Sequence, residues 1–178
     1  MNRIHALALG AGFLCLAATA GTAVAHVTLE AREAPAGSYY KAVVKVPHGC
    51  EGTATTAIRV RLPEGVVNAK PMPKPGWTLT TKEGEYVQAY ESHGRTITRG
   101  VTEIAWTGGT LPDAWYDEFV FQAVLPKRPA GTVLYFPIVQ ECEKGVHRWI
   151  EIPEPGKSPA DYREPAPSLT LTDKPQGR

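Results

Sequence analysis

The residue with the most distinctive chemistry in this chain is His26, because it follows a site at which exported proteins are cut. The sequence before it reads Ala23-Val24-Ala25, and signal peptidase accepts small residues at the first and third of these positions. Cleavage after Ala25 would leave His26 with a free α-amine beside its imidazole. Two such nitrogens can chelate one metal ion, and nitrogen ligands in a flat arrangement favour Cu(II) among divalent ions. The alternative is that a histidine at this position is incidental.

Residues 1–25 have the composition of a signal peptide. Arg3 supplies a positive start, residues 4–19 are dominated by Ala, Leu, Gly and Phe, and no acidic residue occurs before Glu30. The apolar stretch is short for a membrane span, and the cleavage site follows it at once. We therefore expect export to the periplasm and removal of this segment; an uncleaved membrane anchor is the alternative.

Two cysteines remain after that removal, Cys50 and Cys142. An even pair in an oxidising compartment predicts a disulfide, and two unpaired buried thiols are the alternative. Such a bridge would hold Glu51 on a short loop and would bring the strand that carries Trp149 to the same end of the fold. The carboxylate of Glu51 is a candidate metal ligand, although a solvated acid and a core aromatic are the commoner roles of these two residues.

Two further histidines, His48 and His147, lie beside the same cysteines. Either one can reach the copper ion or a second ion, although a role facing solvent is commoner for each. Carriers of Cu(I) usually cluster methionine or cysteine sulfur, whereas Met72 is the one methionine after residue 25. The donor set therefore favours Cu(II), and we expect Cu(I) to bind poorly.

The segments that must position these residues are predicted to be β-strands. Apolar and polar residues alternate with a period of two, and turns rich in Gly and Pro separate the alternating segments. The strands are expected over residues 27–29, 40–46, 58–62, 86–90, 101–106, 119–125, 133–139 and 146–152. With 17 Gly and 16 Pro there is little room for helices, and one helical turn is expected over residues 112–116.

This spacing predicts an all-β fold, an antiparallel β-sandwich of the immunoglobulin or fibronectin III type with about seven to nine strands. A small closed barrel is the alternative. We expect the copper-binding domain to span residues 26–155. Residues 156–178 are expected to form a Pro-rich tail, in which residues 168–171 add a last edge strand.

Charge and hydropathy exclude several classes of partner. The chain has 19 Lys and Arg against 18 Asp and Glu, and Arg3 leaves with the signal peptide, so the mature chain is formally neutral. The absence of a basic block argues against nucleic acid as a partner. After residue 25 no apolar run reaches the length of a membrane span, so no membrane anchor is expected in the mature chain.

Several short segments, taken in order, resemble the YcnI-like family of exported copper-binding proteins. They are His-Val-Thr-Leu-Glu at 26–30, Ala-Gly-Ser-Tyr at 36–39, Val-Lys-Val-Pro at 44–47, Ala-Thr-Thr at 54–56, Lys-Pro-Gly-Trp at 74–77, and Trp149 followed by the Pro-rich segment. The resemblance covers essentially the whole mature region. It implies a β-sandwich that binds Cu(II) in a one-histidine brace.

Carried over residue by residue, the resemblance gives each candidate a role. His26 supplies amine and imidazole, Glu51 matches the family's acidic ligand, and Trp149 matches the tryptophan beside the metal. The pair Cys50 and Cys142 resembles a subset of the family. Some members carry a C-terminal membrane anchor, and none is expected here.

We therefore expect a periplasmic Cu(II) carrier or buffer in copper homeostasis, not an enzyme, whose partners are the copper ion and other periplasmic copper proteins. One alternative is a copper-dependent redox enzyme of the two-histidine brace type, which needs a second imidazole from His48 or His147. Another is a β-sandwich interaction module without metal. No nucleophile motif or phosphate loop is present, so no conventional catalytic residues are expected.

Overall fold

The computed structural model describes residues 26–92 and 94–174, so the predicted signal peptide lies outside the described residues. The described part forms twelve β-strands and one short 3-10 helix, η1 (Pro159–Asp161). The strands are β1 (Thr28–Leu29), β2 (Glu33–Pro35), β3 (Tyr39–Val46), β4 (Thr55–Arg61), β5 (Val67–Pro71), β6 (Thr78–Ser92), β7 (Arg95–Leu111), β8 (Asp117–Val124), β9 (Val133–Tyr135), β10 (Ile138–Cys142), β11 (Val146–Trp149) and β12 (Ser168–Thr172).

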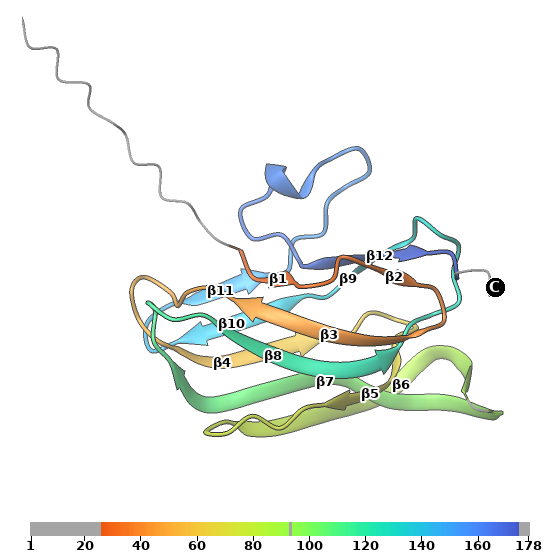
Figure 1. Cartoon of the computed structure of the whole chain (residues 1–178), viewed down its shortest axis with the longest axis horizontal. Helices are drawn as coiled ribbons and strands as arrows, with labels where there is room; N and C mark the ends of the chain where they lie inside the picture. Colours follow the sequence, from red (N-terminus) through yellow and green to blue (C-terminus); the bar gives the residue numbers. More distant parts are fainter. Residues whose placement is uncertain (1–25, 93, 175–178) are drawn as a thin grey trace, which may run out of the picture.

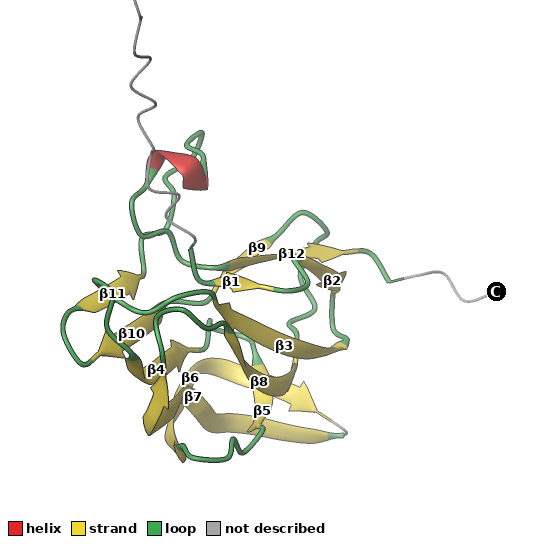
Figure 2. Cartoon of the chain, turned by 60° about the vertical axis from the view of Figure 1, so that its left-hand side comes forward, coloured by secondary structure: helices red, strands yellow, loops and turns green. Residues whose placement is uncertain are grey.

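Two main sheets form the sandwich. One has the strand order β1-β3-β8-β5 and the other β11-β10-β4-β7-β6, and all of their pairings are antiparallel. A third sheet of order β2-β12-β9 lies beside them (Figure 1). Figure 2 shows the two main sheets as separate layers. The predicted all-β antiparallel sandwich is therefore confirmed, and the sheets do not close into a barrel.

The period-two pattern of β3 explains how the layers face each other. Tyr40, Ala42, Val44 and Val46 are all buried, while Lys41 between them is exposed. Across the strand pair, β8 places phenylalanines opposite two of these residues, and β4 and β7 supply apolar side chains from the other sheet. Burial of one face of each sheet supplies the main driving force for this arrangement.

The hairpin formed by β6 and β7 is longer than the alternation predicts. These strands have 15 and 17 residues, and the hairpin extends at the lower right of Figure 1. Most side chains of β6 are exposed or half-buried, and Val87 is 88% exposed. A strand that buries neither face carries no period-two signal, which is why the sequence predicts only the shorter pieces.

The short helix forms at a different place from the one expected. Residues 112–116 make a turn closed by a hydrogen bond from the Trp115 amide to the Pro112 carbonyl, at 3.0 Å. The helix is η1, where Ser158 caps the amide of Ala160 and Asp161 accepts from the Ser158 amide in return. In residues 26–92 and 94–174, no helix is long and apolar enough to cross a membrane.

The C-terminal segment also differs from the expectation. β12 forms where a strand is predicted, but it is a central strand, pairing antiparallel with β9 and parallel with β2. Its Leu169 and Leu171 are both 0% exposed and belong to the main core. The prediction of an edge strand is wrong because its partners lie far away in the sequence, at residues 33–35 and 133–135.

Candidate metal centre

The candidate centre surrounds Trp149, the last residue of β11. Its side chain is completely buried, and two histidine rings pack against its indole. The centroid of the His26 ring lies 5.4 Å from the indole in a T-shaped contact, and that of His147 lies 4.9 Å away with the planes 31° apart. The segment before β1 and the β10–β11 hairpin therefore meet, although His26 and Trp149 are 123 positions apart in the sequence.

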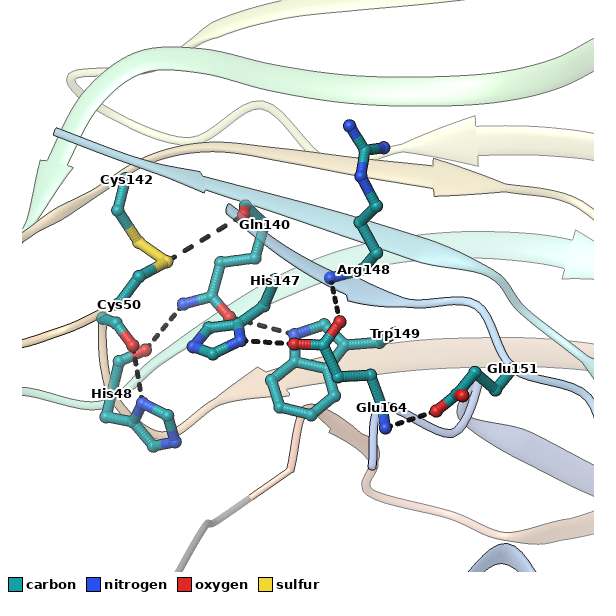
Figure 3. A network of polar contacts seen from close by, with 10 residues as sticks. His48, Cys50, Gln140, Cys142, His147, Arg148, Trp149, Glu151 and Glu164 are labelled. Carbon is teal, nitrogen blue, oxygen red and sulfur yellow. Dashed lines mark hydrogen bonds and ion pairs between the residues drawn. A yellow bond between two sulfur atoms is a disulfide. The ribbon is translucent and has the colours of Figure 1, made fainter. Parts of the chain in front are cut away.

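The orientation of Trp149 is set by a buried amide. The indole N–H donates to Gln140 Oε1 at 3.1 Å, and Gln140 Nε2 donates to the His48 carbonyl at 2.7 Å and to Thr55 Oγ1 at 2.8 Å (Figure 3). Gln140 is itself 0% exposed. Every polar atom of its amide is paired, so the indole cannot turn without breaking a buried network.

A carboxylate holds the second histidine of the centre. Nδ1 of His147 donates to Glu164 Oε1 at 2.7 Å, and the other carboxylate oxygen accepts from the Arg148 amide at 2.9 Å (Figure 3). Burial alone raises the pKa of the Glu164 carboxyl, but the hydrogen bonds from His147 and Arg148 outweigh it and lower the pKa below its usual value. Glu164 is therefore an ionised anchor for the imidazole.

His48 completes a row of rings at this end of the sandwich. Its ring centroid lies 6.0 Å from that of His147, and the two planes are nearly perpendicular. Nδ1 of His48 lies 2.6 Å from the Gly49 carbonyl oxygen, while the Gly49 amide donates to Asp113 Oδ1 at 2.9 Å. The loop before β4 is thus attached to the turn before β8.

The predicted disulfide is present. Cys50 and Cys142 are bonded, with their Cα atoms 5.8 Å apart and 92 positions between them in the sequence. The bond joins the loop that carries His48 to the end of β10, one short turn before the strand that carries His147. The disulfide therefore holds together two of the segments that form the centre.

Glu51 lies apart from His26 and Trp149. It is exposed, with a φ of +50°, in the turn in which Cys50 and Thr53 exchange backbone hydrogen bonds. Its carboxylate lies beside Gly145, where an added Cβ would be 3.8 Å from Oε1. Glu51 lines neither of the two cavities that border His26. Of the three ligand candidates, the structure brings together His26 and Trp149.

The cavity in front of Trp149 has a volume of about 250 Å³ and includes residues that the sequence does not single out. Its lining consists of His26, His147, Trp149, Tyr162, Arg163 and Glu164. The last three come from the segment expected to be a tail, where no periodic pattern marks them. Only the return of the chain from η1 to β12 brings them to the centre.

The donors around the cavity suit a borderline metal ion. Two imidazoles and one carboxylate offer the nitrogen and oxygen ligands that Cu(II) prefers, and cleavage after Ala25 would add the α-amine of His26. Within residues 26–92 and 94–174, no group of three or more His, Cys, Asp and Glu side chains is arranged to hold a metal ion.

Comparisons with known proteins agree on family and fold. The profile of the family described as "Domain of unknown function (DUF1775)" matches residues 26–171. A search of curated proteins finds no match. An uncharacterized protein from Nocardia farcinica, whose crystal structure has an immunoglobulin-like fold, is 29% identical; the match covers 82% of this chain and 97% of that one, with a TM-score of 0.61. The chain therefore belongs to the DUF1775 family and has an immunoglobulin-like fold.

Proposed function

We propose that this protein is exported and binds Cu(II) as a periplasmic carrier or buffer, through a one-histidine brace at His26. The observation that carries the proposal is the contact between His26 and the buried indole of Trp149, at the edge of a cavity lined by nitrogen and oxygen donors. The resemblance to the YcnI-like copper-binding proteins supports the same assignment.

The chemistry of the brace follows from the two nitrogens of an N-terminal histidine. An α-amine has a typical pKa of about 8 and an imidazole of about 6.5, so coordination can displace both protons near neutral pH. Because one residue supplies both donors, the second bond costs little further entropy. Trp149 forms an apolar wall beside this chelate and excludes water from that side.

Release of the ion follows from the same donors. Nitrogen and oxygen ligands hold Cu(I) weakly, and soft sulfur is scarce here: Cys50 and Cys142 are bonded to each other, and Met72 lies in the loop after β5. Reduction of the bound ion should therefore loosen it. In this proposal Glu51 is a ligand only if its loop moves toward His26 when copper binds.

The test compares three proteins by calorimetric titration with Cu(II): the chain beginning at His26, the same chain with one extra glycine before His26, and His26→Ala. We expect one Cu(II) per chain in the first, and affinity lowered by about tenfold or more in the other two, about 1.4 kcal/mol or more. His93→Ala is the control, since this histidine has no part in the proposal.

Equal affinity in all of these proteins would show that His26 is incidental. Absence of any specific uptake would favour an interaction module without metal. Mass spectrometry of the protein secreted from cells checks the processing step separately, because the brace requires a mature chain that starts at His26.

A further inference from the structure

The hydrogen bond to Glu164 selects one tautomer of the His147 ring. An ionised carboxylate has no proton to donate, so it can act only as an acceptor. The 2.7 Å contact with Glu164 Oε1 therefore places a proton on Nδ1 of His147. In the neutral imidazole, Nε2 then carries the lone pair. Metal-binding histidines commonly have this arrangement, in which a carboxylate fixes the tautomer and the direction of the ring.

Glu164 is itself fixed from two sides. Its Oε2 accepts from the Arg148 amide at 2.9 Å, and its own amide donates to Glu151 Oε2 at 2.6 Å. The side chains of His147 and Glu164 are only 21% and 22% exposed. Figure 3 shows the carboxylate against one nitrogen of the His147 ring and the second nitrogen turned away from it. The Glu164 carboxylate is therefore held in place more firmly than in an exposed ion pair, whose side chains are mobile.

His147 shares its surroundings with His26. Both rings pack on the indole of Trp149, with centroids 4.9 Å and 5.4 Å from it, and both line the same cavity of about 250 Å³. An ion chelated by His26 in this cavity would therefore share the cavity with a second imidazole. No third histidine or acidic side chain is needed, because the backbone amine completes the set of nitrogens.

We infer that His147 is a second imidazole ligand of the bound Cu(II), through Nε2, and that Glu164 positions its ring. The inference rests on the proposed function and changes its ligand set, since it replaces the predicted carboxylate of Glu51 with a nitrogen. The ion would be held by three nitrogens: the amine and imidazole of His26 and the imidazole of His147. This addition concerns binding and assigns no reaction.

Pulsed electron paramagnetic resonance tests the inference, because the remote ring nitrogens reveal how many imidazoles bind Cu(II). The chain beginning at His26 should show two imidazoles, and His147→Ala should show one, with affinity lower by about tenfold or more. His147→Gln serves as the second variant, because its amide can still donate to Glu164 and preserve the fold. His48→Ala is the matched control and should keep both imidazoles.

Glu164→Gln separates a positioning role from a ligand role. It should keep two imidazoles while weakening Cu(II) binding by roughly tenfold, the usual effect of losing a carboxylate behind a metal-binding histidine. Nitrogen NMR of the metal-free parent should show the His147 proton on Nδ1. This second readout does not depend on copper.

The inference is overturned if the parent shows a single imidazole, if either His147 variant keeps two, or if His48→Ala removes the second. In those cases tight binding that still requires His26 would leave the proposed function intact. A parent that takes up no Cu(II) overturns both. A thermal unfolding midpoint for each metal-free variant shows whether it is folded before copper is added.

Discussion

Gln140 links the two histidine-bearing segments of the candidate centre through a single buried amide. It accepts from the Trp149 indole and donates to the His48 carbonyl and to Thr55. In the described part of the chain, no buried side-chain nitrogen or oxygen lacks a hydrogen-bond partner. The orientation of the Trp149 indole beside His26 therefore depends on Gln140, an uncharged residue that is not a candidate metal ligand.

Replacing this amide by an apolar chain of similar size tests that dependence. Gln140→Met should lower the free energy of unfolding by roughly 2–4 kcal/mol. It leaves the buried indole N–H, the buried Thr55 hydroxyl and the part-buried His48 carbonyl without this partner. Urea denaturation measures the change. Gln88→Met, on the exposed part of β6, is the control and should stay within about 0.5 kcal/mol. Similar losses in both variants would contradict this account of the network.

At the scale of elements, the disulfide works with the pairing of β10 and β4. Cys142 is the register partner of Thr55, and the bond reaches from there to Cys50 in the loop before β4. The loop with His48 and the hairpin with His147 are thereby held at one end of the sandwich. The bond also restricts the unfolded chain, since 92 positions separate the two cysteines.

The double variant Cys50→Ser, Cys142→Ser should therefore be less stable than the parent by roughly 2–5 kcal/mol, the range observed when native disulfides are removed. Urea unfolding of the metal-free protein measures this difference. The parent unfolded in the presence of a reductant should show a similar loss. A difference below about 1 kcal/mol would mean that the bond adds little to the pairing of β4 with β10.

At the scale of the whole molecule, we expect the tyrosines to make the fold sensitive to alkali. The pKa of Tyr40 is raised to about 12 by burial and by the negative charge of Glu30, and its hydroxyl donates to the Ala31 carbonyl at 2.8 Å. The pKa values of Tyr86, Tyr90 and Tyr116 are raised as well. In each case the folded state favours the neutral phenol.

The sign of the effect follows from linkage. A group whose pKa is higher in the folded state contributes stability that is complete below its unfolded pKa of 10 and is lost as the pH rises through the folded value of about 12. The free energy of unfolding should therefore fall between pH 10 and pH 12. Urea titrations across this range should show a smaller fall in Tyr40→Phe than in the parent.

Tyr39→Phe is the matched control, because Tyr39 is the neighbouring residue on β3 and its side chain is 59% exposed. It should keep the slope of the parent. If the free energy of unfolding of Tyr40→Phe falls with pH as steeply as that of the parent, burial of the Tyr40 phenol does not cause the loss of stability above pH 10.

Much of the fold is predictable from local pattern. The alternation along 40–46 and 58–62 identifies β3 and β4, and the two remaining cysteines identify the disulfide, because these signals need only near neighbours or a count. The length of the exposed hairpin of β6 and β7 is underestimated, because its exposed strands do not alternate between apolar and polar residues. Export and processing at His26 stay predictions, since residues 1–25 lie outside the described part.

The sequence by itself determined the fold class, the identity of His26 and Trp149 as candidates, and the pairing of Cys50 with Cys142. Only the tertiary structure decided that Glu164 holds His147, that Glu51 lies away from the cavity beside His26, and that β12 sits between β2 and β9. The physical reason is the sequence distance over which each feature is determined. Every second residue of a strand shows which of its faces is buried, so a local pattern is sufficient. The choice of a neighbouring strand depends on which distant segments can bury their apolar faces and satisfy their polar groups together.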